Sequence, residues 1–177
     1  MPIQNVLMNA GTWLNASNDS NRFDGDSYMN VGRVGYQEAY EARPLINFNN
    51  DGFSGQILSA SLRIYSLAAD NGMWVTGYKV NRAFNIASTW RDPWTTPGCN
   101  AITEDRSNVA LLTSTRLAAG WNTLPVADLT ELLAVIDGND TILLVGDNHT
   151  AVGIDKANVP YLAIEYKTSI VGGIQIF

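Results

Sequence analysis

The ten residues 56–65 alternate between apolar and polar side chains, and this pattern constrains the fold more than any other feature of the chain. A period of two places one face of an extended strand on a core and the other on solvent. Asp70-Asn71-Gly72 follows closely, and Asn-Gly is a strong hairpin signal because both residues tolerate a positive φ. The sequence therefore predicts a β-hairpin whose second strand is 73–80.

Further short strands are predicted around this hairpin, separated by turn signals. Their expected ranges are 3–8, 28–31, 43–48, 109–113, 122–125, 141–145, 160–166 and 174–177. The range 141–145 is apolar without alternation, which indicates a central strand covered on both faces. About ten short strands without βαβ alternation predict an all-β sandwich or barrel.

One segment shows the period of a helix. Its apolar residues recur at i, i+3, i+4 and i+7, and they are Leu129, Leu132, Leu133 and Ile136. Asp128 precedes them as an N-cap, and Glu131 stands three residues later as in a capping box. Asp137-Gly138 then ends the pattern. The sequence predicts one short helix here.

The composition excludes several classes of function. The net charge is −6 and only three lysines occur, which argues against a surface that binds nucleic acid. The single Cys99 excludes an internal disulfide and a cysteine-rich zinc site. No run approaches the roughly 18 apolar residues of a membrane span, so no membrane partner is predicted. The first residues do not show the pattern of a signal peptide, which is expected either of a mature form restarted at Met or of a protein that acts without Sec export.

No catalytic set is predicted, so the chain is not expected to be an enzyme. His149 has no serine on a Gly-x-Ser-x-Gly elbow to activate. Most acidic residues stand in turn contexts such as Asp51-Gly52. A polysaccharide-cleaving enzyme, which needs two carboxyl groups roughly 5–10 Å apart, is kept as the third alternative.

An Asn/Asp-rich loop at 15–26 invites a calcium interpretation. Asp19, Asp24 and Asp26 offer the oxygen atoms that hard cations prefer. The EF-hand register fails, because Phe23 and Asp24 occupy the fifth position and the glycine position. Turn formation by Asp and Asn side chains is the competing explanation, and no cofactor is predicted apart from this irregular site.

Five tryptophans could include a platform for sugar rings. Trp94 lies in a long loop bounded by proline and glycine, and with Tyr36 and Tyr40 it forms the candidate glycan-binding set. Loop closure is the competing role for Trp94. Trp90 and Trp121 are expected to fill the core or to close its ends, since large aromatic side chains are on average highly buried.

Both ends of the chain are apolar. Residues 1–25 are interpreted as an arm and loop, 26–167 as the β-sandwich and 168–177 as a tail. Large exposed apolar patches mark contact surfaces, so the ends form a candidate assembly interface. Its residues are Leu7, Trp13, Ile174, Ile176 and Phe177. The alternative is that both ends add edge strands to their own sandwich.

A series of short motifs over residues 26–167 resembles one known family. Each motif is weak alone, but their order and spacing together are more specific. They are Asp26-x-Tyr28-x-Asn30-x-Gly32, Arg43-x-Leu45-Ile46-x-Phe48, Ile57-x-Ser59-Ala60-x-Leu62-x-Ile64-Tyr65, Ser88-Thr89-Trp90, Pro93-Trp94-Thr95-Thr96-Pro97-Gly98, Gly120-Trp121-Asn122-Thr123-Leu124, Asp128-Leu129-Thr130 and Val159-Pro160-Tyr161-Leu162-x-Ile164-x-Tyr166. The set is similar to the DNRLRE domain family, also called disaggregatase-related.

The resemblance implies a jelly-roll β-sandwich. Members of the family occur as modules of secreted bacterial and archaeal proteins, some similar to carbohydrate-binding modules, and related domains occur in bacteriophage structural proteins. The first interpretation is a non-enzymatic virion protein, a decoration or cement protein on the capsid of a tailed phage. It is expected to be a homo-oligomer, with a trimer favoured, that binds coat subunits. The alternative is an extracellular carbohydrate-binding module or adhesin that recognises a surface polysaccharide.

Overall fold

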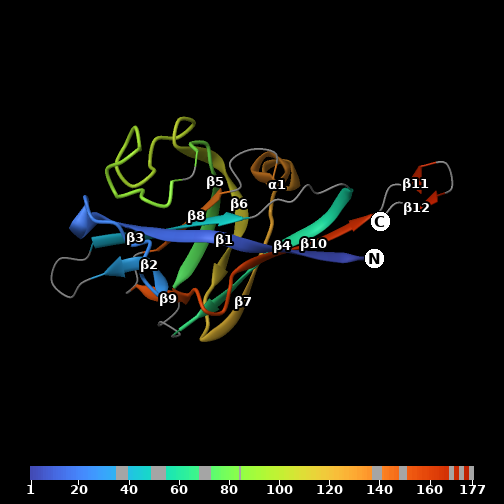
Figure 1. Cartoon of the computed structure of the whole chain (residues 1–177), viewed down its shortest axis with the longest axis horizontal. Coiled ribbons are helices and arrows are strands. Elements are labelled where there is room, and N and C mark those ends of the chain that lie inside the picture. Colours follow the sequence, from blue (N-terminus) through green and yellow to red (C-terminus); the bar gives the residue numbers. More distant parts are fainter. Residues whose placement is uncertain are drawn as a thin grey trace.

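The computed structural model describes residues 1–34, 40–48, 55–67, 73–83, 85–136, 141–147, 151–167, 170–171 and 174–175. Its elements are drawn in Figure 1. In chain order they are β1 (Ile3–Asn15), the 3-10 turn η1 (Ala16–Asn18), β2 (Tyr28–Val34), β3 (Tyr40–Phe48), β4 (Gln56–Ser66), β5 (Trp74–Val80), β6 (Arg106–Arg116), β7 (Gly120–Pro125), α1 (Leu129–Ile136), β8 (Thr141–Gly146), β9 (Val152–Asp155), β10 (Tyr161–Lys167), β11 (Ile170–Val171) and β12 (Ile174–Gln175).

Six strands form a closed antiparallel barrel. Around the ring the order is β1, β10, β4, β9, β2 and β3, and β3 pairs back with β1. β8, β5 and β6 extend the sheet outward from β3, and β7 pairs with β4. The expected all-β chain is therefore confirmed, with α1 as the one α-helix in the described ranges. The predicted turns at 51–52, 70–72 and 137–138 lie outside those ranges.

Two strands change partners along their length and so close the barrel. The first residues of β1, Ile3 to Leu7, pair with β10, whereas Ala10 to Asn15 pair with β3 after an irregularity in register. β2 pairs first with β9 and then, from Gly32, with β3. Such irregularities bend a strand and increase its twist. The segment expected as an N-terminal arm thus contributes the longest strand of the barrel.

The core explains why 141–145 does not alternate. Ile142 and Leu144 of β8 lie in the main core. Leu143 faces the other way, into a second apolar cluster formed with residues of the loop 85–105. β8 lies between β3 and β5, and Thr141 to Leu144 are all buried. The predicted central strand, covered on both faces, is confirmed.

The predicted helix is confirmed with its cap. An Asp128 carboxylate oxygen accepts hydrogen bonds from the backbone amides of Thr130 (2.8 Å) and Glu131 (3.0 Å). Leu132 is fully buried and anchors α1 on the core. The Glu131 carboxylate lies 3.8 Å from the Lys79 ammonium group on β5. This ion pair links α1 to the sheet.

A close approach of two backbones makes Gly146, at the end of β8, intolerant of a side chain. A Cβ atom there would lie 2.9 Å from the Cα and N atoms of Gly32 on β2. We expect Gly146→Ala to lower the free energy of unfolding by about 1–3 kcal/mol, because a backbone has to move. Gly25→Ala is the control, since a Cβ there meets nothing within 4 Å. Equal denaturation midpoints for the two variants would contradict the expectation.

Candidate functional site

The predicted glycan-binding tryptophan is buried. Trp94 is 7% exposed and packs with Leu14, Leu45 and Leu143 in the second apolar cluster. Its indole N–H donates to the Thr89 carbonyl at 2.9 Å. Because neither face of the ring is open to a sugar, Trp94 closes the loop 85–105 over the sheet. This placement agrees with loop closure, the competing role of Trp94, and not with a stacking platform.

The structure does not describe the side chains of the two tyrosines proposed beside Trp94. Tyr36 lies outside the described residues, and so does His149. Of Tyr40 the backbone is described, and it pairs with Val34 where β2 meets β3. None of the three rings in the candidate glycan-binding set is therefore described on the surface.

One buried carboxylate organises the loop 85–105. Asp105 is fully buried and its oxygens accept hydrogen bonds from the backbone amides of Thr95 (2.8 Å), Thr96 (3.1 Å) and Ala101 (3.1 Å). The Arg82 guanidinium donates to it at 2.7 Å. Burial raises the pKa of Asp105, but these hydrogen bonds outweigh burial and hold the pKa below its usual value. Asp105 therefore holds the loop 85–105 in its conformation through hydrogen bonds to its backbone.

A buried arginine holds the same loop from the other side. Arg43 on β3 donates to the Gly98 carbonyl and to the Asn100 side chain, each at 2.7 Å. It also pairs with Glu41 at 2.6 Å, and its guanidinium lies 5.3 Å from the centre of the Trp90 ring. Trp90 is half-buried against the second apolar cluster, in agreement with the expected closing role.

The cysteine thiol is held in its protonated form. Cys99 is a buried residue of the loop, and its Sγ lies 3.6 Å from the Asp105 carbonyl oxygen. Burial, reinforced by the Asp105 charge, raises the pKa of Cys99 to about 12. Since the thiolate is the reactive form, this thiol packs as a small apolar group.

The three carboxylates of the candidate calcium site are engaged separately. Asp19 pairs with Arg91 at 2.5 Å, Asp26 accepts from the Trp13 indole at 2.9 Å, and Asp24 lies 3.7 Å from the Arg22 guanidinium. No group of three or more acidic, histidine or cysteine side chains that could hold a metal occurs within the described ranges. Asp19, Asp24 and Asp26 therefore do not form the oxygen cluster that the calcium interpretation requires.

The predicted assembly residues lie in different environments. Leu7 is 56% exposed on β1, but Trp13 is buried and packs on Phe23 with ring centres 4.2 Å apart. Ile174 belongs to β12, of which the backbone alone is described, and Ile176 and Phe177 lie outside the described residues. Of this set, Leu7 is placed on an open surface.

Three aromatic rings, one arginine and one leucine lie on the outer face of the sheet formed by β1, β10, β4 and β7. We call it the outer aromatic face. Its residues are Leu7, Arg63, Tyr65, Trp121 and Tyr161. They face outward because they alternate with buried residues of the same strands. Leu7 pairs with Tyr161, Tyr161 with Arg63, and Tyr65 with Trp121.

The rings of this face meet edge to face. Trp121 and Tyr65 have ring centres 5.6 Å apart at an interplanar angle of 86°, and Trp121 and Tyr161 lie 5.8 Å apart at 61°. Trp121 is 44% exposed, which corrects the expectation that it fills the core. One signal in the sequence could have shown this exposure, because Trp121 and Thr123 alternate with the buried residues Asn122 and Leu124. The pairing of β7 with β4, which brings Trp121 beside Tyr65, could not be predicted from the sequence.

Arg63 adds a positive charge to the outer aromatic face. It lies between Tyr161 on β10 and Thr123 on β7, two residues before Tyr65. Its Nε is buried and has no hydrogen-bond partner in the part of the chain that the structure describes. Within the same ranges Arg63 forms no ion pair.

A second surface feature is an open hollow of about 630 Å³ lined by Arg82, Ala83, Asn85 and Pro93. Its one charged side chain, Arg82, is held by Asp105 and by the Thr95 hydroxyl. A ligand in the hollow would have to compete for a guanidinium that already binds a buried carboxylate.

No family model matches the sequence, and no curated protein matches it. No helix within the described ranges is long and apolar enough to cross a membrane.

Proposed function

We propose that the protein is a non-enzymatic structural protein of a virion, a decoration or cement protein on the capsid of a tailed bacteriophage. The observation that carries the proposal is the C-terminal pair of strands. β11 and β12 pair with each other and form a sheet of their own, which does not join the main sheet. Figure 1 shows them beyond the end of β10, away from the barrel.

An isolated two-stranded hairpin is marginally stable in water and needs something to pack against. A neighbouring subunit supplies such a surface. Figure 1 places the N-terminus at the same end of the molecule as β11 and β12. There the first strand begins with an exposed apolar residue, Ile3, which is 68% exposed. Two chain segments at one end of the protein thus favour contacts between subunits.

The proposal includes the fold family. We propose that the barrel and its outer strands are a variant of the jelly-roll sandwich that the resemblance to the DNRLRE family implies. Its support is that β1 pairs first with β10 and then with β3, and β2 first with β9 and then with β3, because strands that switch sheets form the corners of a sandwich. A capsid offers many identical sites, so modest contacts of an oligomeric decoration protein add up through multivalency.

Light scattering on the full chain tests this proposal. We expect an oligomer, with a trimer of about 58 kDa favoured, three times the chain mass of 19.3 kDa. Removing residues 168–177 is expected to give a 1–167 monomer with an unchanged far-UV spectrum, because β11 and β12 are not part of the main sheet. A full-length chain that stays monomeric and does not bind empty capsids would contradict the proposal.

A further inference from the structure

We propose that the outer aromatic face is the surface that docks on the coat protein, and that Arg63 selects a partner surface carrying a carboxylate. This inference rests on the proposed function and names the chemistry of the partner. The face lies on β1, β10, β4 and β7, apart from β11 and β12. It is therefore a second contact, distinct from the one between copies of the chain.

The residue types of this face are those that dominate the energetics of protein interfaces. Tryptophan, tyrosine and arginine are enriched among interface hot spots and at interface centres, where lysine and acidic residues are depleted. Here Trp121, Tyr65, Tyr161 and Arg63 lie together, with the exposed Leu7 at the edge. They stand on strands that pair with one another, so their backbone positions are fixed before binding, which reduces the entropy lost on docking.

The angles between the rings favour a protein over a polysaccharide. A sugar chain that stacks on several rings needs those rings to lie roughly in one plane. Trp121 stands at 86° to Tyr65 and at 61° to Tyr161, so the three rings form an uneven surface. Side chains of a partner protein can pack between such rings, as they do in a protein core.

The charge of Arg63 defines the partner further. Docking would cover the guanidinium, and a buried charge is costly unless it is paired and hydrogen-bonded. No described residue of this chain pairs with it, and its Nε already lacks a partner. A carboxylate on the coat subunit would accept two parallel hydrogen bonds from the planar guanidinium.

The size of the face fits a weak contact that is repeated. Its residues lie in two rows about 7 Å apart along four strands spaced about 4.8 Å, which gives on the order of 200 Å². A standard stable interface buries about 800 Å² on each partner. One contact of this size is modest, and several on one capsid would reinforce each other.

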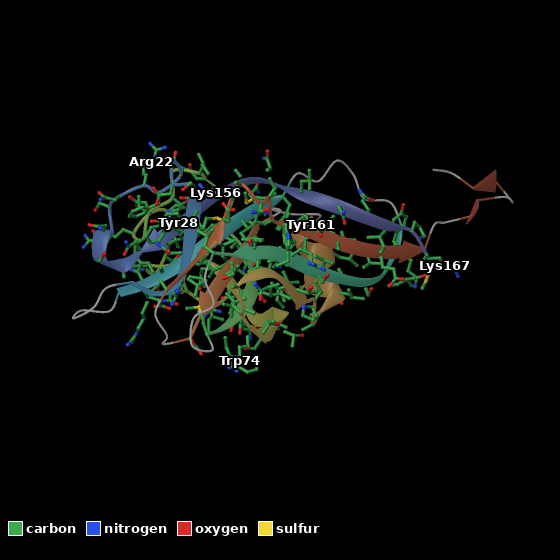
Figure 2. The ribbon with its side chains drawn as sticks, turned by 90° about the horizontal axis from the view of Figure 1, so that it is seen from below. Arg22, Tyr28, Trp74, Lys156, Tyr161 and Lys167 are labelled. Carbon is green, nitrogen blue, oxygen red and sulfur yellow. The ribbon has the colours of Figure 1, made fainter. Side chains whose placement is uncertain are left out.

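The test measures binding of the full-length protein to empty capsids of the phage that encodes it. We expect Trp121→Ala and Arg63→Gln each to weaken binding by roughly 30-fold, with Arg63→Lys intermediate because an ammonium group cannot bind bidentately. Trp74→Ala is the matched control, since Trp74 is 49% exposed on β5. Figure 2 shows Trp74 at the edge of the molecule, far from Tyr161. Thermal unfolding checks that every variant is folded.

The outcomes separate this inference from the proposed function. If the wild type binds capsids and the Trp121 and Arg63 variants bind equally well, the docking inference is overturned while the virion function stands. If the wild type does not bind, both fall. If it instead binds members of a polysaccharide panel and Trp121→Ala abolishes that binding, the face is a glycan site and the inference is overturned.

Discussion

Asp105→Asn is expected to lower the free energy of unfolding by about 3–5 kcal/mol, a large part of the stability of a domain of this size. The Asp105 carboxylate accepts from three backbone amides and from Arg82. An amide group would turn an N–H₂ donor toward some of these donors. It would also leave the Arg82 charge without its counterion. Chemical denaturation measures the effect.

Glu104→Gln is the matched control for this variant. Glu104 is the neighbouring acidic residue and is exposed, so the same change of charge is expected to alter stability by less than about 0.5 kcal/mol. If Asp105→Asn lowers the free energy of unfolding no more than Glu104→Gln does, the Asp105 carboxylate does not hold the loop in place. Quenching of tryptophan fluorescence by iodide gives a second readout, because release of the loop would expose Trp94.

The same carboxylate gives the stability a predictable dependence on pH. The pKa of Asp105 lies below its usual value in the folded protein, so the folded state binds the proton less tightly than the unfolded chain. Its contribution is therefore present above the unfolded pKa of about 3.9 and is lost as the pH falls through the folded pKa. In Asp105→Asn this contribution to acid unfolding is absent, which titration of the unfolding midpoint against pH would show.

Arg43→Met is expected to cost about 3 kcal/mol of unfolding free energy. The substitution keeps an apolar stem of similar length but removes the donors to Gly98, Asn100 and Glu41. The Gly98 carbonyl is buried, and a buried acceptor that loses its donor carries the cost of its desolvation. The position of Trp90 over the guanidinium would change as well.

Arg22→Met is the control for the arginine prediction. The Arg22 side chain is 55% exposed and its ion pair with Asp24 is long, 3.7 Å, so its loss is expected to change stability by less than about 0.5 kcal/mol. A loss at Arg43 no larger than that at Arg22 would show that the buried network does not hold the loop.

Several elements of the fold were predictable because neighbours along the chain encode them. The alternation at 56–65 predicts β4, the apolar run at 141–145 predicts the buried β8, and the spacing after Asp128 predicts α1. β9 was missed because four residues are too few to show a period. β11 was also missed, because two residues show no pattern.

The candidate site could not be predicted in the same way. The sequence left Trp94 open between a binding ring and loop closure, and it predicted burial for Trp121, which is exposed. Nothing near Asp105 in the sequence distinguishes it from the exposed Glu104. In each case the environment comes from residues distant in the chain, such as Leu45 and Leu143 around Trp94.

The sequence by itself determined the class of fold, since strand periodicity, turn residues and helix caps depend on residues close together in the chain. The tertiary structure alone decided which strands lie side by side and which loop covers them. Alternation marks the apolar face of a single strand, but the neighbours of that strand come from residues distant in the chain. Here the loop 85–105 covers β3 and β8, whereas the outer aromatic face carries Trp121 and Arg63 on its surface.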